Sequence, residues 1–195
     1  VACKIFRTTR VRLRARESRG TEHAMNATTT PWLEAPGVIL RPLEPNDADA
    51  LFAAHGDEQT HRFWSAPAHK DVAQTRAYIE DTLNMGRAWA ITESGGEALG
   101  RIALFDVRDG VGEIGVIMRR NAQGRGLASK ALSLVCDYGF NQLGLHRIAA
   151  DIDPDNNASI SLFLRVGFQR EGLLRKNWKT HIGVRDSVIM SKLKE

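Results

Sequence analysis

Short apolar segments occur at intervals through the first two thirds of the chain, in the pattern of β-strands. Four of them cover residues 38–43, 88–92, 98–107 and 111–118. Glycine-containing turns separate the last three, Gly95-Gly96 and Asp109-Gly110. An Asp-Gly pair between two apolar runs is typical of a β-hairpin. The pattern therefore predicts one strand, followed later by a three-stranded antiparallel meander.

Two helices are predicted between the first strand and the meander. Asn46 or Asp47 can cap the first, because apolar residues follow at helical spacing. The second is expected over residues 71–83. Both helices therefore precede the hairpins and are available to cover the sheet that the hairpins form.

Helical and strand-like patterns alternate after residue 120. Residues 121–126 open a helix whose apolar positions share one face, Leu127, Ala131, Leu134, Val135 and Tyr138. Gly144 is expected to end it. The later elements are a strand at 145–152, a helix from 156 to about 167, and strands at 169–174 and 186–193. We therefore expect one α+β domain with a mixed sheet, a meander first and then β-α-β-α-β.

Length and composition limit the classes of protein. A chain of 195 residues suffices for one domain or a domain with an arm. No run approaches 18 apolar residues, so we expect no transmembrane helix and no membrane partner. The two cysteines, Cys3 and Cys136, exclude a disulfide scaffold, and no Cys/His spacing is typical of a zinc site, so no metal is expected. This composition favours a cytoplasmic protein.

The net charge of +4 is concentrated at the N-terminus. Residues 1–24 hold seven of the 27 basic side chains and two of the 23 acidic ones, a net charge of +5. Residues 25–195 then carry a net charge of −1. The body therefore has no broad electrostatic surface for phosphate backbones, and no nucleic-acid partner is indicated for it.

Residues 1–24 are poor in apolar side chains and rich in arginine, so we expect a disordered basic arm or a non-native leader. A single domain would then occupy residues 25–195. The arm could contact RNA or the ribosome, or act as an arginine-rich targeting peptide. A third interpretation, which we favour, is an upstream translated segment before a true start at Met25, because the chain begins with Val1.

A glycine loop, Gly124-Arg125-Gly126, lies between a predicted strand and a predicted helix. Glycines there let backbone N–H groups approach an anion, and the helix N-terminus adds partial positive charge, so a pyrophosphate is the natural ligand. The alternative is a tight turn with no ligand. Lys130 is misplaced for a Walker loop, and Ser129 stands where a Rossmann fingerprint needs its third glycine.

A wider set of motifs resembles the GCN5-related N-acetyltransferase (GNAT) superfamily. Residues 121–126 match Q/R-x-x-G-x-G/A with Asn121 at the first position, residues 156–159 match N-x-x-S, and Gly167-Phe168 follows Asn156 at the usual spacing. Residues 113–115, 143–148 and 183–186 narrow the resemblance to the RimJ/RimL-like branch. The resemblance covers about residues 38–193. It implies a mixed, mostly antiparallel sheet with a splayed parallel strand pair flanked by helices.

The resemblance also implies acetyl-CoA as co-substrate and a set of residues that bind it. The phosphate loop would be formed by Gln123, Gly124, Arg125, Gly126, Leu127 and Ala128. The strand 115–118 would pair with the pantetheine arm and splay from residues 145–152, and the backbone N–H of Ile117 or Met118 would meet the thioester oxygen. Asn156 would bond the pantetheine arm, and it can cap its helix at the same time.

Three positions depart from the family pattern. Asn121 replaces the usual Gln or Arg, which matters little if backbone amides bind the phosphates. Phe163 occupies the place where many relatives have a tyrosine that protonates the thiolate, so that role is unavailable there. Trp178 stands where some ribosomal-protein acetyltransferases have a glutamate base, which leaves the acceptor open.

Acetyl transfer to an amine needs a neutral amine, a donor for the oxyanion and a proton for the leaving thiolate. Ser159 is the best candidate acid, and its alternative role is that of a first-turn helix serine. Glu113 is the best candidate base, directly or through a water; alternatively it pairs with Arg101 or Arg147. His146 is expected to be structural, as is Asp186. Trp64 is either a substrate platform or a core residue.

These residues and the family resemblance predict an acyltransferase that moves an acetyl group from acetyl-CoA to a primary amine in a ternary complex. A site without a strong base suits an α-amine, with a pKa of about 7.7–8.0, better than a lysine amine near 10.4. The acceptor is therefore expected to be a protein N-terminus or a small amine. The alternatives are a polyamine or antibiotic acetyltransferase, a non-catalytic acyl-CoA-binding module, and a ribosome-binding protein that uses the arm. A homodimer is compatible with the sequence.

Overall fold

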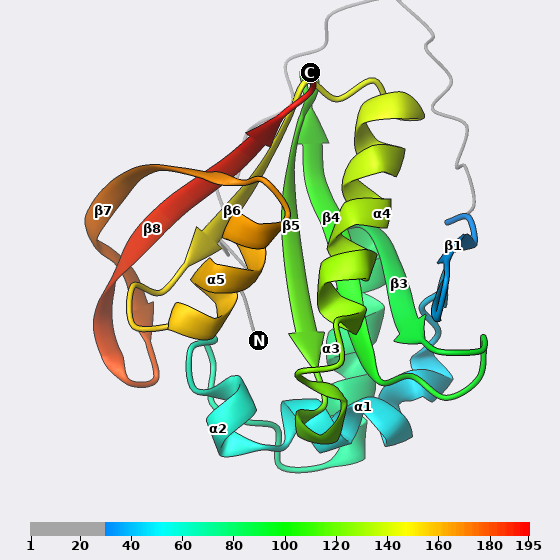
Figure 1. The fold of residues 1–195 in the computed structure, drawn as a ribbon. Helices are drawn as coiled ribbons and strands as arrows, with labels where there is room; N and C mark the ends of the chain where they lie inside the picture. Colours follow the sequence, from blue (N-terminus) through cyan, green and yellow to red (C-terminus); the bar gives the residue numbers. More distant parts are fainter. Residues whose placement is uncertain (1–29) are drawn as a thin grey trace, which may run out of the picture.

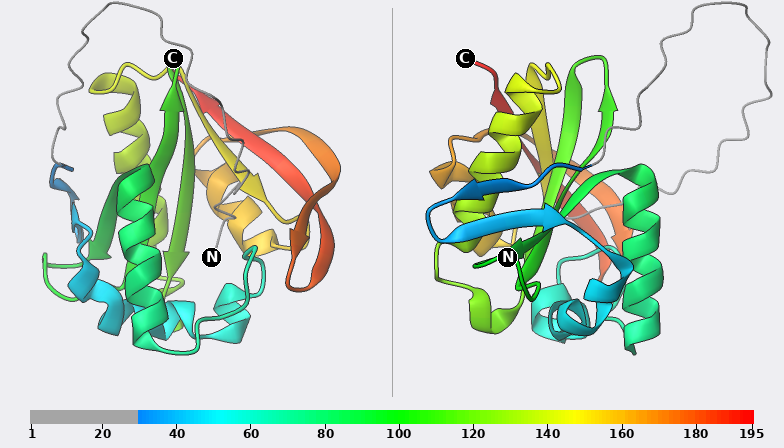
Figure 2. Two further views of the ribbon diagram at one scale, coloured as in Figure 1. Left: turned by 180° about the vertical axis from the view of Figure 1, so that it is seen from behind. Right: turned by 90° about the vertical axis from the view of Figure 1, so that its right-hand side faces the viewer.

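Eight strands form one mixed sheet in the computed structural model, which describes residues 30–195 (Figures 1 and 2). Their order is β1-β2-β3-β4-β5-β6-β8-β7, and every neighbouring pair is antiparallel except β5 and β6, which are parallel. The strands are β1 (Leu33–Ala35), β2 (Val38–Pro42), β3 (Gly86–Thr92), β4 (Gly100–Arg108), β5 (Val111–Met118), β6 (Arg147–Ile152), β7 (Gln169–Thr180) and β8 (Gly183–Leu193). The expected arm, residues 1–24, lies outside the described residues.

Helices cover both faces of the sheet, as the two turned views show (Figure 2). Helices α1 and α3 lie on one face, α4 and α5 on the other, and the short α2 connects α1 to α3. The helices are α1 (Ala48–His55), α2 (Glu58–His61), α3 (Val72–Met85), α4 (Leu127–Asn141) and α5 (Asn157–Arg165), with 3-10 turns η1 (Pro45–Asp47) and η2 (Arg120–Ala122). None of the helices in the described part of the chain combines the length and the apolar character that crossing a membrane requires.

Side-chain caps explain where three of these helices begin. At the start of α2, the Asp57 carboxylate accepts from the backbone N–H of Thr60 at 2.7 Å. The Asp71 carboxylate accepts a hydrogen bond from the backbone N–H of Gln74 at 2.8 Å and starts α3. The Asn156 amide oxygen accepts from the backbone N–H of Ser159 at 3.1 Å and starts α5. The cap predicted for α1 differs: Asp47 occupies the N-cap position, but its carboxylate accepts from Arg41 and from the backbone of Glu44 instead of capping α1.

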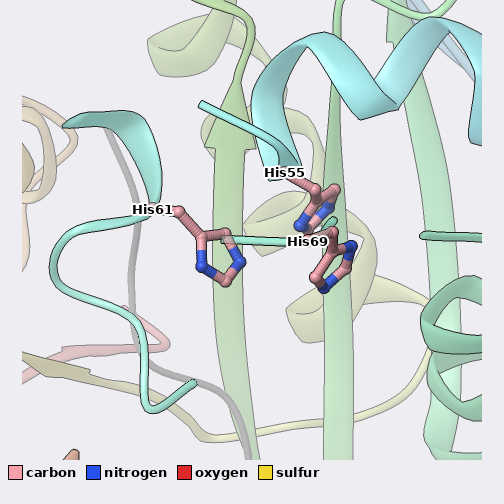
Figure 3. Close-up of side chains that lie close together, drawn as sticks. All are labelled: His55, His61 and His69. Carbon is pink, nitrogen blue, oxygen red and sulfur yellow. The ribbon is translucent and has the colours of Figure 1, made fainter. Parts of the chain in front are cut away.

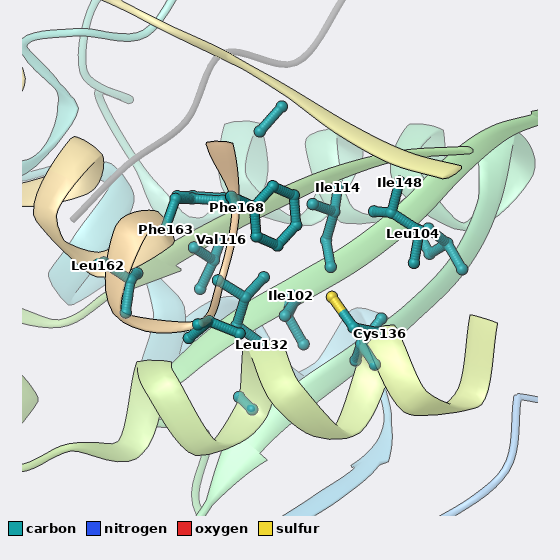
Figure 4. Close-up of a cluster of buried hydrophobic side chains, with 14 of the residues drawn as sticks. Ile102, Leu104, Ile114, Val116, Leu132, Cys136, Ile148, Leu162, Phe163 and Phe168 are labelled. Carbon is teal, nitrogen blue, oxygen red and sulfur yellow. The ribbon is translucent and has the colours of Figure 1, made fainter. Parts of the chain in front are cut away.

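The core has two layers because side chains of the central strands alternate between the two faces of the sheet. Ile102 and Leu104 of β4 belong to the cluster under α4 and α5, whereas Ala103 and Phe105 belong to the cluster under α1 and α3. Figure 4 shows the first cluster packed between α4 and the strands, with the Cys136 side chain inside it. The predicted α+β architecture with a three-stranded meander is confirmed.

The only parallel pair of the described sheet separates along its length. Strand β5 pairs with β6 only where Val111–Glu113 meets Arg147–Ala149. Beyond Glu113 the two strands diverge, and α5 lies near the widening gap (Figure 1). The splayed pair implied by the family resemblance is therefore present.

Several element boundaries differ from those the pattern predicts. Strands β7 and β8 are longer than predicted because β7 is an edge strand with mostly exposed residues, so the added residues need no apolar alternation. Helix α4 ends before Gly144, which has a φ of +68° and lies in the following turn. The three-residue β1 and the four-residue α2 were too short to give a periodic signal.

Candidate active site

The glycine loop presents the N-terminus of α4 to open space. Gly124 and Gly126 have φ values of +76° and +77°, a region that favours glycine. A Cβ at either position would meet no heavy atom within 4 Å. Gly126 is the N-cap of α4, so no side chain caps the first amides of the helix. Those amides lack intrahelical acceptors and are available to an anion.

A hollow of about 360 Å³ lies against this loop. The lining residues are Met118, Ala122, Gln123, Gly124, Gly126, Leu127, Ala128, Ser129, Leu162 and Arg165. No carboxylate is among them, and the guanidinium of Arg165 adds positive charge. Free amides, a cation and space beside two glycines fit the pyrophosphate of a nucleotide cofactor.

A second hollow of about 220 Å³ adjoins the first, because Gln123 lines both. The other residues that line it are Gln59, Thr60, Phe63, Arg120, Asn156 and Ala158. They come from α2 and its flank, from the turn after β5 and from the start of α5. The hollow therefore lies where the diverging ends of β5 and β6 leave the sheet.

An ion pair joins the α2 side of this second hollow to the loop after β5. Arg120 Nη2 contacts both carboxylate oxygens of Asp57 at 2.7 Å. The hydrogen bond from Arg120 lowers the pKa of Asp57 below its ordinary value. The Asp57 carboxylate is thus already paired with an arginine.

The register of β4 and β5 determines which backbone groups face the gap. The bond from Arg119 N–H to the Leu99 oxygen, at 2.9 Å, identifies that pair as hydrogen-bonded. Since antiparallel bonding involves alternate pairs, Arg101–Ile117 is also hydrogen-bonded and Gly100–Met118 is not. The backbone of Met118 therefore faces away from β4, towards the gap, and its oxygen accepts from Gln123 Nε2 at 3.2 Å. Of the two expected donors, Met118 has the better orientation.

Most of the residues expected to contact acetyl-CoA line the two hollows. Met118, Gln123, Gly124, Gly126, Leu127 and Ala128 line the first, and Asn156 lines the second. Ile117 lies in the core layer under α1 and α3, and Arg125 pairs with Glu93 at the surface. Arg165 was missed by sequence reasoning; its signal is the helical spacing from Ala158 and Leu162.

Ser159 lies in the first turn of α5 and is completely buried. Its backbone N–H is used by the Asn156 cap, whereas its Oγ has no hydrogen-bond partner among the described residues. It does not line either hollow, although its neighbour Ala158 does. An unused buried hydroxyl costs about 1–3 kcal/mol, so this position is not explained by capping alone.

Two carboxylates lie on the face of the sheet that carries α1 and α3, near the point where β5 and β6 separate. Glu113 is half-buried on the last paired position of β5, beside Ala149. Asp151 lies two residues further along β6, and its Oδ2 accepts from Trp178 Nε1 at 2.7 Å and from Asn177 Nδ2 at 3.1 Å. Trp178, the departure from the family pattern, thus contacts a carboxylate that sequence reasoning did not select.

The remaining candidates take the following places. Trp64 is buried in the core, as one of the two interpretations expects, and its neighbour Phe63 lines the second hollow. Asp186 accepts from the backbone N–H of Lys176 at 2.7 Å, which agrees with a structural role. His146 is exposed, and its backbone N–H bonds the Gly110 oxygen at 2.8 Å.

Comparison with known proteins identifies the class to which this fold and loop belong. Residues 38–169 match the family described as "Acetyltransferase (GNAT) domain". The chain therefore belongs to the GNAT acetyltransferase family, and it is an enzyme of that class. GNAT acetyltransferases use acetyl-CoA, so acetyl-CoA is the co-substrate.

Individual relatives are similar to this chain over most of their length. The N-acetyltransferase p20 of Bacillus licheniformis, whose function is uncharacterized, is 34% identical over 165 residues, 80% of this chain and 93% of p20. Spermidine N(1)-acetyltransferase of Escherichia coli K12 is 29% identical over 143 residues, 72% of this chain and 77% of the enzyme. The structure of Mycobacterium smegmatis RimJ in complex with CoA-disulfide has 25% identity and a TM-score of 0.72, and covers 84% of this chain and 86% of RimJ.

Proposed function

We propose that this N-acetyltransferase acts on the α-amine of a protein N-terminus or of a small α-amino compound, by direct attack in a ternary complex. The observation that carries the proposal is the lining of the second hollow, which, among the residues that the structure describes, includes Arg120 and no carboxylate. A polyamine carries several positive charges, and its binding site needs acidic side chains to balance them. A peptide N-terminus carries one charge, which it loses before it attacks.

The chain's own groups are assigned to the steps as follows. The α4 amides and Arg165 would hold the pyrophosphate of acetyl-CoA, which supplies the activated acetyl group. The backbone N–H of Met118 would donate to the thioester oxygen, and Asn156 would bond the pantetheine arm. Ser159 would hold a proton for the departing sulfur, which would explain its unused buried hydroxyl.

The amine itself must be neutral when it attacks. Glu113 would take up its proton, directly or through a water, from the edge of the gap. An α-amine with a pKa of about 7.7–8.0 is roughly one-tenth neutral at pH 7, whereas only about one lysine amine in 2,500 is neutral. A carboxylate is a weaker base than an amine, so this site favours the acceptor whose amine is less basic.

A polyamine is the second candidate acceptor, because one relative of similar length is a spermidine acetyltransferase. Three acceptors distinguish the classes: a peptide with a free N-terminus and no lysine, the same peptide with a blocked N-terminus and one lysine, and spermidine. Thiol release from acetyl-CoA gives kcat/KM for each. We expect the free N-terminus to be the best substrate. Faster turnover of spermidine or of the lysine peptide would contradict the proposal.

A further inference from the structure

Three histidines from separate segments converge in the core beside the second hollow (Figure 3). His55 is the last residue of α1, His61 is the last residue of α2, and His69 lies in the loop before α3. One ring nitrogen of each lies within 4.8 Å of the other two, and all three residues are buried. Their sequence spacing resembles no common zinc motif, so the cluster is visible only in the fold.

The outer hydrogen bonds of two of these rings determine which nitrogen carries a proton. His61 Nδ1 lies 3.1 Å from the Ala66 oxygen, and because a carbonyl only accepts, Nδ1 donates and Nε2 keeps a lone pair. His69 Nδ1 lies 3.0 Å from Thr75 Oγ1. The Thr75 hydroxyl donates its own proton to the backbone oxygen of Asp71, so it accepts a hydrogen bond from His69 Nδ1. His69 Nε2 therefore also has a lone pair. Imidazoles held in this way by their second nitrogen are typical metal ligands.

Two of the three inner nitrogens lack partners within the described residues. His55 Nδ1 and His61 Nε2 are buried without a hydrogen bond. Such groups are unfavourable in a protein core unless something binds them. Burial lowers the pKa of His61 to about 3 and that of His69 to about 4, so both rings are neutral near pH 7. Neutral imidazole is the form that binds a metal ion.

We propose that His55, His61 and His69 bind one divalent transition cation of the Zn²⁺ type, through Nδ1 of His55 and Nε2 of the other two. Tetrahedral Zn²⁺ with Zn–N bonds of about 2.0–2.1 Å separates its nitrogens by about 3.4 Å. The rings therefore need to move together by about 1 Å on binding. Three imidazoles without a thiolate or carboxylate suit Zn²⁺, Cu²⁺ or Ni²⁺ better than Mg²⁺ or Ca²⁺.

The site would fix the connection between α1 and α3. Helix α2 has four residues, too few to be stable without tertiary support. Gln59, Thr60 and Phe63, which line the second hollow, belong to this connection. A cation bound by His55, His61 and His69 would contact the start, the middle and the end of this connection. It would therefore stabilise one wall of the hollow, whatever substrate the enzyme acetylates.

Arg101 limits the affinity of the proposed site. It is buried beside the histidines, and its Nε lies 3.4 Å from His55 Nε2. Coordination through His55 Nδ1 places a proton on Nε2, so this contact must open. Arg101 keeps its bond to the Tyr78 hydroxyl and its positions over the rings of Trp64 and Tyr78, 5.4 Å and 4.8 Å from the centroids. Its charge opposes a second cation, so Arg101→Met should bind the metal more tightly than the wild type.

Cobalt(II) tests the proposal directly because its visible absorption reports the coordination of the ion. The full chain is freed of metal with a chelator and titrated with Co²⁺, and Zn²⁺ affinity is measured by competition. We expect one Co²⁺ ion to bind per chain and to give the visible absorption typical of tetrahedral Co²⁺. We also expect Zn²⁺ to raise the melting temperature. His61→Gln and His69→Gln should each weaken Zn²⁺ binding by about ten-fold or more. Loss of a residue that only hydrogen-bonds to a metal ligand already has an effect of this size.

Two control variants separate this site from other histidines and cysteines of the chain. His146→Gln changes an exposed histidine outside the cluster and should bind Zn²⁺ as the wild type does. Cys3→Ser combined with His23→Gln tests the N-terminal ligands and should also leave binding unchanged. An acetyl-CoA-induced melting shift confirms that each variant is folded. Absence of cobalt absorption in the wild type, or its persistence in both His61→Gln and His69→Gln, would overturn the proposal.

Discussion

The hydroxyl of Ser159 is buried and lacks a partner among the described residues. Ser159 lies in the first turn of α5, the helix near the cofactor gap. If it donates a proton to the thiolate, it stabilises charge that appears only late in the reaction. We therefore expect Ser159→Ala to lower kcat by about ten-fold or more and to change the acetyl-CoA Kd by only a few-fold.

Stability distinguishes this role from a structural one. Removal of an unsatisfied buried hydroxyl should not lower the melting temperature, because no hydrogen bond is lost. Full kcat together with a lower melting temperature in Ser159→Ala would show that the hydroxyl supports the helix start. The proton for the thiolate would then come from solvent.

The pH dependence of turnover identifies the base. Glu113→Gln should move the rise of kcat/KM to higher pH, because the amine then has to lose its proton to solvent. The effect should be smaller for an acceptor whose amine is weakly basic. Asp151→Asn is the matched comparison, since it changes the other carboxylate near the separation of β5 and β6. If Asp151→Asn shifts the profile and Glu113→Gln does not, Asp151 is the base.

Residue roles were predictable where a local constraint determines them. The conformation of the two loop glycines was predictable from local sequence, because a tight turn from a strand into a helix places residues in the left-handed region that favours glycine. The choice between Ile117 and Met118 could not be predicted from the sequence, since it depends on the register between β4 and β5. Asp151 was missed because its partner Trp178 lies 27 residues later in the chain and meets it only in the folded sheet.

At the scale of elements, the start of α4 carries the cofactor assignment. Gly126→Ala adds a Cβ in the open space beside the loop and places alanine at a φ of +77°, at a cost of about 1–2 kcal/mol. We expect it to reduce or abolish the melting shift that acetyl-CoA causes. Gly144→Ala is the matched control, because Gly144 also has a positive φ and open space but does not line the hollow. An equal acetyl-CoA shift in both variants would show that the loop is only a turn.

The strands β6, β7 and β8 are joined by an acid-sensitive contact. Hydrogen bonds from Arg147 and Ser191 lower the pKa of Glu171 to about 2. An unfolded glutamate has a pKa of about 4.3, so the stabilisation is complete above that pH and is lost as the pH falls towards 2. Glu171→Gln should therefore reduce the acid dependence of the melting temperature between about pH 4.5 and pH 2. The effect should be small because the carboxylate is partly exposed.

The elements were predictable where burial imposes a period. Helix α4 and the meander bury one or both faces, so their apolar residues recur at 3.6 or 2 positions. The full length of β7 and β8 could not be predicted from the sequence, because edge strands can carry polar residues on both faces. The His55, His61 and His69 cluster was equally hidden, since it depends on how the connection between α1 and α3 folds back.

At the scale of the whole molecule, the described residues 30–195 supply a lined cofactor hollow and both layers of the core. A chain that starts at Met25 should therefore keep its melting temperature and its acetyl-CoA-induced shift. Differential scanning fluorimetry of the full and shortened chains measures both. Loss of either in the shortened chain would show that residues 1–24 pack against the domain.

The central claim is acetyl transfer from acetyl-CoA to a free α-amine, and product mass together with thiol release tests it most directly. The full chain is incubated with acetyl-CoA and a lysine-free peptide that has a free N-terminus. The account predicts N-terminally acetylated peptide and free CoA thiol in equal amounts, both strongly reduced in Gly126→Ala and unaffected in Gly144→Ala. Thiol release without acetylated peptide, or no product while spermidine or a lysine peptide is acetylated, would contradict it.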